Sequence, residues 1–175
     1  MFNNWLQAIG KLDYARKKNH PNVECILCAI RDNDERVKSL KFYQNKLIFC
    51  CLNVFPYNSA HSLIATNRHI TLFTELTKEE ILIINRTIQG LQILFDDLFC
   101  PEGYNIGINQ GEKAGASISH LHFHLVPRYG SELGFIDIVG KSKIILEGLQ
   151  SVLLKIKENV NKFLNDEFFK EFKKK

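Results

Sequence analysis

The sequence has little net charge and no apolar run that suggests a signal or a membrane span. It carries 23 Lys and Arg against 19 Asp and Glu, a formal net charge of +4. Part of this excess lies in the run 173–175, interpreted as a solvated tail, so nucleic-acid binding is not expected. The first twenty residues lack the apolar core of a secretory signal and carry Lys11, Asp13 and Arg16. These absences favour a cytoplasmic protein without a membrane partner.

The chain also lacks a linker or a repeat that would divide it. Its 175 residues, 45% of them hydrophobic, suit one domain with a substantial core. Five cysteines, an odd number, indicate a reducing compartment. We expect Cys50, Cys51 and Cys100 to be small core residues. Cys25 and Cys28 form a Cys-x-x-Cys motif, typical of a redox pair, of half a zinc site or of two unrelated core thiols.

The most informative stretch is 120–127, where histidines alternate with apolar residues. This period of two predicts a half-buried strand that ends at Pro127. His120, His122 and His124 would lie on one face of it, each roughly 7 Å from the next. Three interpretations are open. The face is simply solvated, or two histidines chelate zinc, or one imidazole is a nucleophile that the others support.

A glycine-containing hairpin precedes this strand. Residues 104–109 predict a short strand, and the loop that follows contains Gly111 and Gly115. Glycines let backbone N–H groups approach a ligand closely, and short neutral side chains add hydrogen bonds, which together suit a bound phosphate. The neutral side chains of this segment are Asn109, Gln110 and Ser117.

Two β-branched and apolar stretches, 46–54 and 60–66, flank the turn sequence Pro-Tyr-Asn-Ser and predict a second hairpin. This hairpin would bring Asn53 and His61 to the histidine strand. Each is ordinary on its own, as an asparagine near a turn or a histidine at a strand start. Their position beside the histidines favours a role in the site.

Helical periodicity predicts three helices. The central one begins after Thr77, with Glu80 completing a capping box, and polar residues interrupt it so that it does not span a membrane. Amphipathic patterns over 2–19 and 144–173 predict helices at the two ends. Hairpins separated by a long helix make an α+β fold with an antiparallel sheet.

These residues resemble the histidine-triad (HIT) superfamily, whose signature is His-x-His-x-His followed by apolar residues. The resemblance covers about 25–146 and includes Asn53 eight residues before His61, and Asn-Arg-His-Ile at 67–70. The run after Val126 looks most like the diadenosine tetraphosphate hydrolase or phosphorylase branch. The resemblance implies a HIT fold with about five antiparallel strands, and a homodimer that shares its sheet between two protomers.

The resemblance also implies a function for this single HIT domain, 1–175. His122 would attack the α-phosphoryl group of a dinucleoside polyphosphate such as diadenosine tetraphosphate, and water would cleave the nucleotidyl-histidine. Neutral imidazole is a competent nucleophile near neutral pH, since its unperturbed pKa is about 6.5. His120 and His124 would complete the catalytic set. The implied substrate-binding residues are Asn53, His61, Asn109, Gln110, Gly115 and Ser117.

Zinc-bearing members of the superfamily pair a Cys-x-x-Cys with two histidines. That pairing implies a metal site made of Cys25, Cys28, His69 and His120. Four protein ligands leave no open position, so the zinc would be structural. Mg²⁺ is expected only as a companion of the polyphosphate substrate.

Several alternatives stay open. Inorganic phosphate in place of water would give phosphorolysis of the ATP adenylyltransferase type, and a purine nucleoside phosphoramidase is also possible. A zinc hydrolase that uses the three histidines directly and a non-catalytic nucleotide-binding adaptor belong to other classes. The sequence departs from the family pattern at Ala60, where glycine is usual, and at Ala116, where many members have glycine or glutamine. It also departs at Gly134, where the phosphorylase-like branch often has asparagine, and this weakens the phosphorylase assignment.

Overall fold

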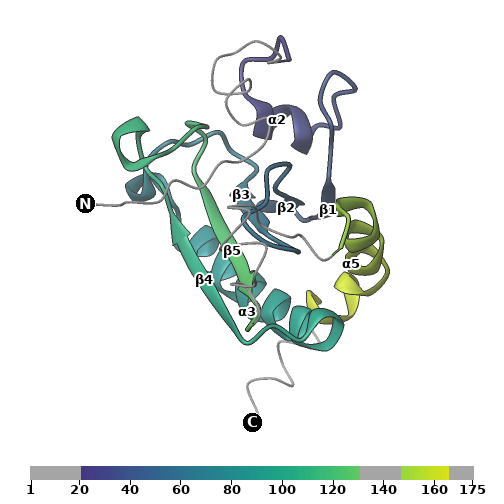
Figure 1. Ribbon diagram of the computed structural model, residues 1–175. Helices are drawn as coiled ribbons and strands as arrows, with labels where there is room; N and C mark the ends of the chain where they lie inside the picture. The colour runs from purple at the N-terminus through teal and green to yellow at the C-terminus, as the bar shows by residue number, and fades with distance from the viewer. Residues whose placement is uncertain (1–20, 131–146, 166–175) are drawn as a thin grey trace, which may run out of the picture.

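The computed structural model describes residues 21–130 and 147–165 (Figure 1). Five antiparallel strands form one sheet in the order β1-β2-β3-β5-β4. The strands are β1 (Lys41–Gln44), β2 (Ile48–Leu52), β3 (Ser62–Thr66), β4 (Gly103–Ile108) and β5 (His122–Arg128). Both predicted hairpins and the α+β fold are confirmed. The predicted stretches did not include β1, which is only four residues long.

Within these two described ranges three helices flank the sheet: α2 (Ile26–Arg31), α3 (Lys78–Phe99) and α5 (Leu149–Phe163). Two 3₁₀ turns, Phe73–Glu75 and Glu112–Ala114, lie in the connections. The predicted helix over 2–19 and the departure at Gly134 lie outside the described residues. In the described residues no helix is both long and apolar enough to cross a bilayer.

The predicted capping box at the start of α3 is confirmed. The Thr77 hydroxyl accepts a hydrogen bond from the Glu80 N–H at 3.2 Å, and the Glu80 carboxylate accepts one from the Thr77 N–H at 2.9 Å. The same buried carboxylate pairs with both Nε and Nη2 of Arg68 at 2.9 and 2.8 Å. The start of α3 is therefore fixed to the segment that carries His69.

Apolar cores on both faces of the sheet explain why every residue of β2 is buried. Ile48, Cys50 and Leu52 pack against α3 and α5 on one face. Phe49 and Cys51 point to the other face, toward the short helix α2. Because side chains alternate along a strand, a central strand covered on both faces contains only buried residues. The face that carries α2 is the one on which the candidate site is built.

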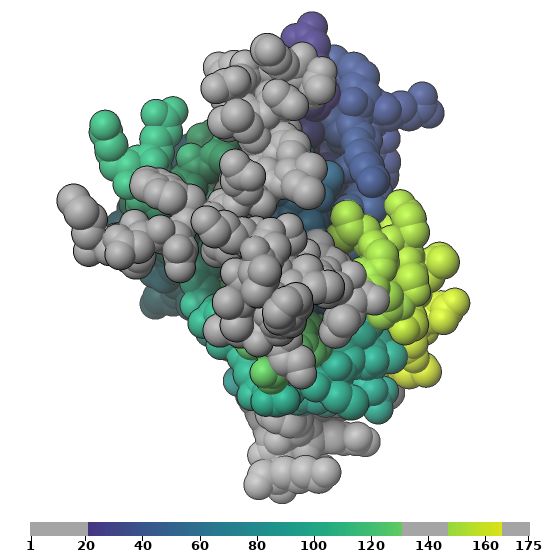
Figure 2. All heavy atoms as spheres, viewed as in Figure 1, coloured from purple at the N-terminus to yellow at the C-terminus, as the bar shows by residue number. Residues whose placement is uncertain are grey.

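Close packing joins α3 to α5, whose atoms adjoin in the space-filling view (Figure 2). At Gly90 an added Cβ would lie 2.5 Å from the Phe163 carbonyl oxygen and 2.6 Å from Leu164 Cδ2. The absence of a side chain at Gly90 therefore allows α5 to approach α3 closely. Helix α5 is shorter than the stretch predicted from 144 to 173, since its last helical residue is Phe163 and Leu164 caps it. The rest of that prediction, beyond 165, lies outside the described residues.

Two other expectations were wrong. Cys100 is exposed, because it is the C-cap of α3 and adopts a left-handed conformation (φ 47°, ψ 52°) that turns it out of the helix. Pro127 does not end the histidine strand but pairs with Tyr104 inside β5. Its carbonyl accepts a hydrogen bond from the Asn58 side chain at 3.0 Å. Pairing with β3 stops at Leu125, opposite Ser62, so Pro127 lies beyond the part of β5 that β3 covers.

Candidate active site

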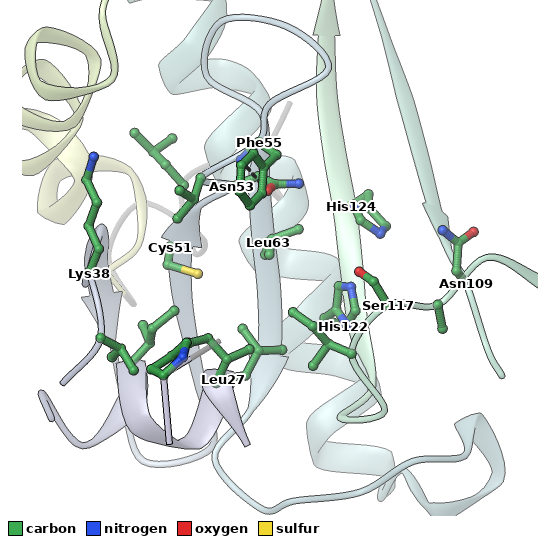
Figure 3. A pocket seen from close by; sticks show the side chains of 18 of the residues that line it. Leu27, Lys38, Cys51, Asn53, Phe55, Leu63, Asn109, Ser117, His122 and His124 are labelled. Carbon is green, nitrogen blue, oxygen red and sulfur yellow. Dashed lines mark hydrogen bonds between the residues drawn. The ribbon is translucent and has the colours of Figure 1, made fainter. Parts of the chain in front are cut away.

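A cavity of about 550 Å³ opens on the α2 face of the sheet (Figure 3). Polar side chains gather at one end, where Asn109, Ser117, His122 and His124 lie. Toward the other end the wall is apolar and comes from α2 and the sheet, with Leu27, Cys51 and Leu63 among its residues. Asn53 lines the cavity between these regions. An apolar cavity with a few converging polar groups is the usual form of a small-molecule site.

His122 is the first residue of β5 and is only 4% exposed. Its Nδ1 lies 2.7 Å from the backbone carbonyl oxygen of His120. A carbonyl only accepts hydrogen bonds, so this Nδ1 carries the proton and Nε2 keeps its lone pair. Burial lowers the pKa of His122, which favours the neutral ring. The structure therefore holds an unprotonated imidazole nitrogen in the wall of the cavity.

A second histidine of β5, His124, is linked to His61. The Tyr57 N–H donates to His61 Nδ1 at 3.0 Å, and His61 Nε2 lies 2.9 Å from His124 Nδ1. When both rings are neutral, His61 must donate through Nε2, so His124 accepts through Nδ1 and carries its own proton on Nε2. His122 and His124 thus differ in chemistry: the first offers a lone pair at Nε2 and the second an N–H.

His120 does not share the strand with the other two histidines, because β5 begins at His122. Its ring is fully buried beside Cys25, Cys28 and His69, and its Nε2 lies 3.0 Å from the Thr66 carbonyl oxygen. The predicted face of three histidines is therefore split between two sites. His120 contributes its backbone carbonyl to the His122 site and its imidazole to a cysteine cluster.

The turn before His61 contains a constrained residue. Ala60 has a φ of +60°, a left-handed conformation that glycine adopts without a steric penalty and alanine does not. This explains physically why glycine is common at this position in the family that the sequence resembles. The turn sets the start of β3 so that the Asn53 N–H donates to the His61 carbonyl at 2.9 Å. Asn53 Nδ2 also lies 3.4 Å from His61 Nδ1.

The loop between β4 and β5 brings Asn109, Gly115 and Ser117 to the cavity, as the sequence predicted. Within the described residues neither Asn109 nor Ser117 forms a side-chain hydrogen bond, so both are available to a ligand. The loop amides are less available than expected, because the N–H groups of residues 114 and 116 donate to Gly111 and that of Gly115 to Glu112. Gly111 and Gly115 have φ values of +84° and +90°, which explains the glycines.

Gln110 is not among the residues that line the cavity. Its Oε1 accepts a hydrogen bond from the Phe73 N–H at 2.8 Å. This contact ties the loop to the segment before α3, so in this structure Gln110 supports the loop from the side.

The four predicted metal ligands form a compact cluster beside the cavity. Cys25 lies just before α2 and Cys28 lies within it, and their sulfur atoms meet the rings of His69 and His120. The ligand atoms all lie within 4.8 Å of one another. The contacts to Nδ1 measure 3.3 Å (Cys28 to His69), 3.5 Å (Cys28 to His120) and 3.7 Å (Cys25 to His120). A zinc tetrahedron would separate sulfur and nitrogen ligands by about 3.5 Å.

The protonation states of the cluster also suit a cation. The Nε2 of His120 donates to the Thr66 carbonyl, which leaves its Nδ1 lone pair facing the two sulfur atoms. Burial, with His69 nearby, lowers the pKa of His120 to about 4, so the ring stays neutral. Burial and the neighbouring Cys25 raise the pKa of Cys28 to about 11. Two adjacent thiolates require a positive charge between them, and a metal ion would supply it.

The sequence did not single out several residues of the cavity. Tyr57 stacks on the His61 ring with centroids 4.9 Å apart and lines the cavity. Its position in a turn of the sequence gave no indication that it would line a cavity. Cys51, two residues before Asn53 on the same face of the chain, lies in the wall, as does Lys38. The two-residue spacing from Asn53 would have indicated Cys51, but nothing local marks Lys38.

Known proteins resemble this chain in sequence and in structure. An AP-4-A phosphorylase of Mycobacterium tuberculosis is 36% identical over 103 residues, 58% of this chain and 53% of that protein. A bis(5'-nucleosyl)-tetraphosphatase [asymmetrical] of Schizosaccharomyces pombe is 29% identical over 103 residues, 59% of this chain and 57% of that protein. The chain thus spans little more than half the length of these relatives.

A solved structure has the same fold. It is a Zn-bound histidine triad family protein from Mycobacterium smegmatis, with a TM-score of 0.65 and 22% identity, covering 79% of this chain and 94% of that one. The sequence profile of the HIT domain matches residues 34–131, more than half of the chain. This match includes the two histidines of β5, the Asn53 and His61 pair and the glycine loop, and from it we conclude that the chain belongs to the HIT family.

Proposed function

We propose that the protein is a nucleotidyl hydrolase or transferase that cleaves a dinucleoside polyphosphate, such as diadenosine tetraphosphate, through a covalent intermediate on His122. The observation that carries the proposal is the 2.7 Å contact of His122 Nδ1 with the His120 carbonyl, which leaves the Nε2 lone pair for attack. The names of the phosphorylase and tetraphosphatase relatives support the class of substrate.

In the proposed first step, His122 Nε2 attacks the α-phosphorus and forms a P–N bond. The bond from this phosphorus to the bridging oxygen breaks, and the leaving nucleotide takes the electron pair. His124 is suited to stabilise or protonate that oxygen, because its Nε2 carries hydrogen when the His61 link is intact. Water then attacks the same phosphorus and gives up a proton, to His124 where that ring protonated the leaving oxygen and otherwise to solvent. The P–N bond breaks and neutral His122 is restored. Two displacements replace one difficult step.

The substrate-binding roles follow the same geometry. Asn109 and Ser117, at the His122 end of the cavity, would donate hydrogen bonds to the phosphate oxygens. Asn53 would hold the ribose, since it lies between the polar end and the apolar wall. We propose that Gly115 gives the phosphate close access to the loop and that Gln110 positions this loop through Phe73.

The experiment is intact-protein mass spectrometry after brief mixing with diadenosine tetraphosphate and alkaline quenching. We expect an added nucleotidyl mass in the wild type and none in His122→Ala, with turnover reduced by at least about 10³-fold in the variant. Cys100→Ser, an exposed position away from the cavity, is the matched control. Full turnover in His122→Ala would refute the covalent route and favour a zinc hydrolase. Tight AMP binding without turnover in the wild type would indicate an adaptor.

Phosphorolysis is the second candidate, and it is favoured by the relative named AP-4-A phosphorylase. Only the acceptor differs, because inorganic phosphate would attack the nucleotidyl-histidine in place of water. Adding phosphate to the reaction separates the two. Release of ADP from the adenylyl adduct indicates phosphorolysis, and release of AMP indicates hydrolysis.

We further propose that Cys25, Cys28, His69 and His120 hold a structural zinc ion. The sulfur–nitrogen distances near 3.5 Å and the Nδ1 lone pair of His120 support it. With four protein ligands the ion would have no open position. It would cross-link the segment around α2, the connection after β3 and the loop before β5. The proposal assumes a reducing compartment such as the cytoplasm, where both thiols remain available. Mg²⁺ would enter only with the polyphosphate.

A homodimer completes the proposal. β4 is an edge strand of the described sheet, and its residue Ile106 is 48% exposed. Phe73 is also exposed, and its N–H donates a hydrogen bond to Gln110, two residues beyond the end of β4. An edge that no other described strand covers, and that carries exposed apolar side chains, is suited to pairing with a second copy.

A further inference from the structure

Two basic residues, Arg36 and Lys38, are among those that line the cavity. Figure 3 shows Lys38 and His122 on opposite sides of the cavity, with Cys51 and Leu63 between them. No aspartate or glutamate of the described chain is among the lining residues. The end of the cavity that holds Lys38 lies opposite the residues proposed to bind the phosphate, and is called the basic end below.

The two cations differ in their availability. Arg36 is already engaged, because Nε and Nη2 donate to the Asp34 carboxylate and Nη1 donates to the Asn22 carbonyl. Lys38 is exposed and forms no ion pair or hydrogen bond with the part of the chain that the structure describes. Its ammonium carries three donors and no acceptor.

The orientation of a nucleotide follows from the proposed function, on which this inference rests. With the phosphorus at His122 and the ribose beside Asn53, the base would occupy the apolar region that the described residues form between α2 and the sheet. The edge of a purine that carries the 6-substituent and N7 points away from the ribose. That edge would therefore meet the basic end of the cavity.

A lysine at this edge distinguishes the two common purines. Guanine presents two acceptors there, O6 and N7, whereas adenine presents N7 and a 6-amino donor. The ammonium can donate to both acceptors of guanine, but the adenine amino group would meet another donor. We propose that Lys38 is a specificity-determining residue that favours 6-oxopurine nucleotides, guanine or hypoxanthine, over adenine nucleotides.

The test is calorimetric titration of the full chain with GMP and with AMP, beside Lys38→Met and the control Lys46→Met, an exposed lysine in the β1–β2 turn. We expect GMP to bind about fivefold more tightly than AMP. This is the lower end of the range for a side chain that reads a base edge through two hydrogen bonds, because Lys38 is exposed. Lys38→Met should remove the difference by weakening GMP alone. Lys46→Met should preserve it.

Other outcomes overturn the inference. Equal affinities in the wild type would mean that no group reads the base edge. An equal loss for both nucleotides in Lys38→Met would mean that the cation acts on the phosphate. The nucleotidyl adduct on His122, measured with both diguanosine and diadenosine tetraphosphate, tests the proposed function separately. An adduct formed equally from the two substrates would retain the chemistry and refute the base preference.

Discussion

At the scale of single residues, the chemistry depends on which nitrogen of each imidazole carries a proton. Backbone groups decide this for both histidines of β5. The His120 carbonyl fixes the proton on Nδ1 of His122, and the Tyr57 N–H acts on His124 through His61. Neighbouring residues with the same side chain thereby become a nucleophile and a donor.

The pH dependence of adduct formation tests this assignment. Because burial lowers the pKa of His122 below 6.5, its lone pair should remain available below that pH, and the rate should decline only in more acidic solution. The lowered pKa of His122 also makes the folded protein less stable as the pH falls. Below the unfolded pKa the unfolded chain binds a proton that the folded chain does not, so stability falls as pH decreases toward the folded pKa.

The measurement is the rate of adduct formation by rapid quench across acidic and neutral pH. Circular dichroism at each pH confirms that the protein stays folded. An acid limb centred above pH 6.5 would contradict a buried, neutral nucleophile.

At the scale of elements, the α3–α5 contact depends on the absence of a side chain. In an isolated helix, Gly90→Ala would stabilise by about 1 kcal/mol. In this structure the new Cβ would lie 2.5 Å from a backbone oxygen of Phe163, which cannot turn away as a flexible side chain can. We expect a net loss of about 1–2 kcal/mol in the free energy of unfolding, measured by urea denaturation.

Gly103→Ala is the control for this prediction. It makes the same chemical change in β4, where an added Cβ meets no atom within 4 Å. Its effect should be below about 1 kcal/mol. A Gly90→Ala variant more stable than the wild type would mean that α5 does not approach α3 this closely.

At the scale of the whole molecule, the metal cluster links segments that are far apart in the sequence. We expect one zinc per chain by elemental analysis, and much less in Cys28→Ser. Loss of the ion should lower the free energy of unfolding by about 3 kcal/mol, because a bound metal stabilises the folded state by mass action. Cys100→Ser should keep both the zinc and the stability. Zinc content unchanged in Cys28→Ser would place the metal elsewhere.

The proposed dimer is tested at its edge strand. A charge at Ile106 should prevent pairing of β4 with a second copy, so Ile106→Arg should be monomeric in sedimentation velocity while the wild type is a dimer. Leu154→Arg is the matched control, since Leu154 is 59% exposed but lies on α5. A dimer that survives Ile106→Arg would exclude this edge.

Local patterns in the sequence determined most of the elements. Alternation predicted β5, the turn residues predicted both hairpins, and the Thr77 and Glu80 pair located the start of α3, because each signal acts over only a few residues. The family resemblance then indicated the residues of the site. The single-domain organisation over 1–175 stays a prediction, since the profile match covers 34–131.

Tertiary structure alone decided what depends on contacts between distant segments. It separated His120 from His122 and His124, assigned their tautomers, and used Gln110 to support the loop through Phe73. It also brought Lys38 to the wall of the same cavity. Alternation along a strand predicts which of its residues can share a face. Hydrogen-bond partners and the opposite wall of a cavity come from distant segments, which a local pattern does not contain.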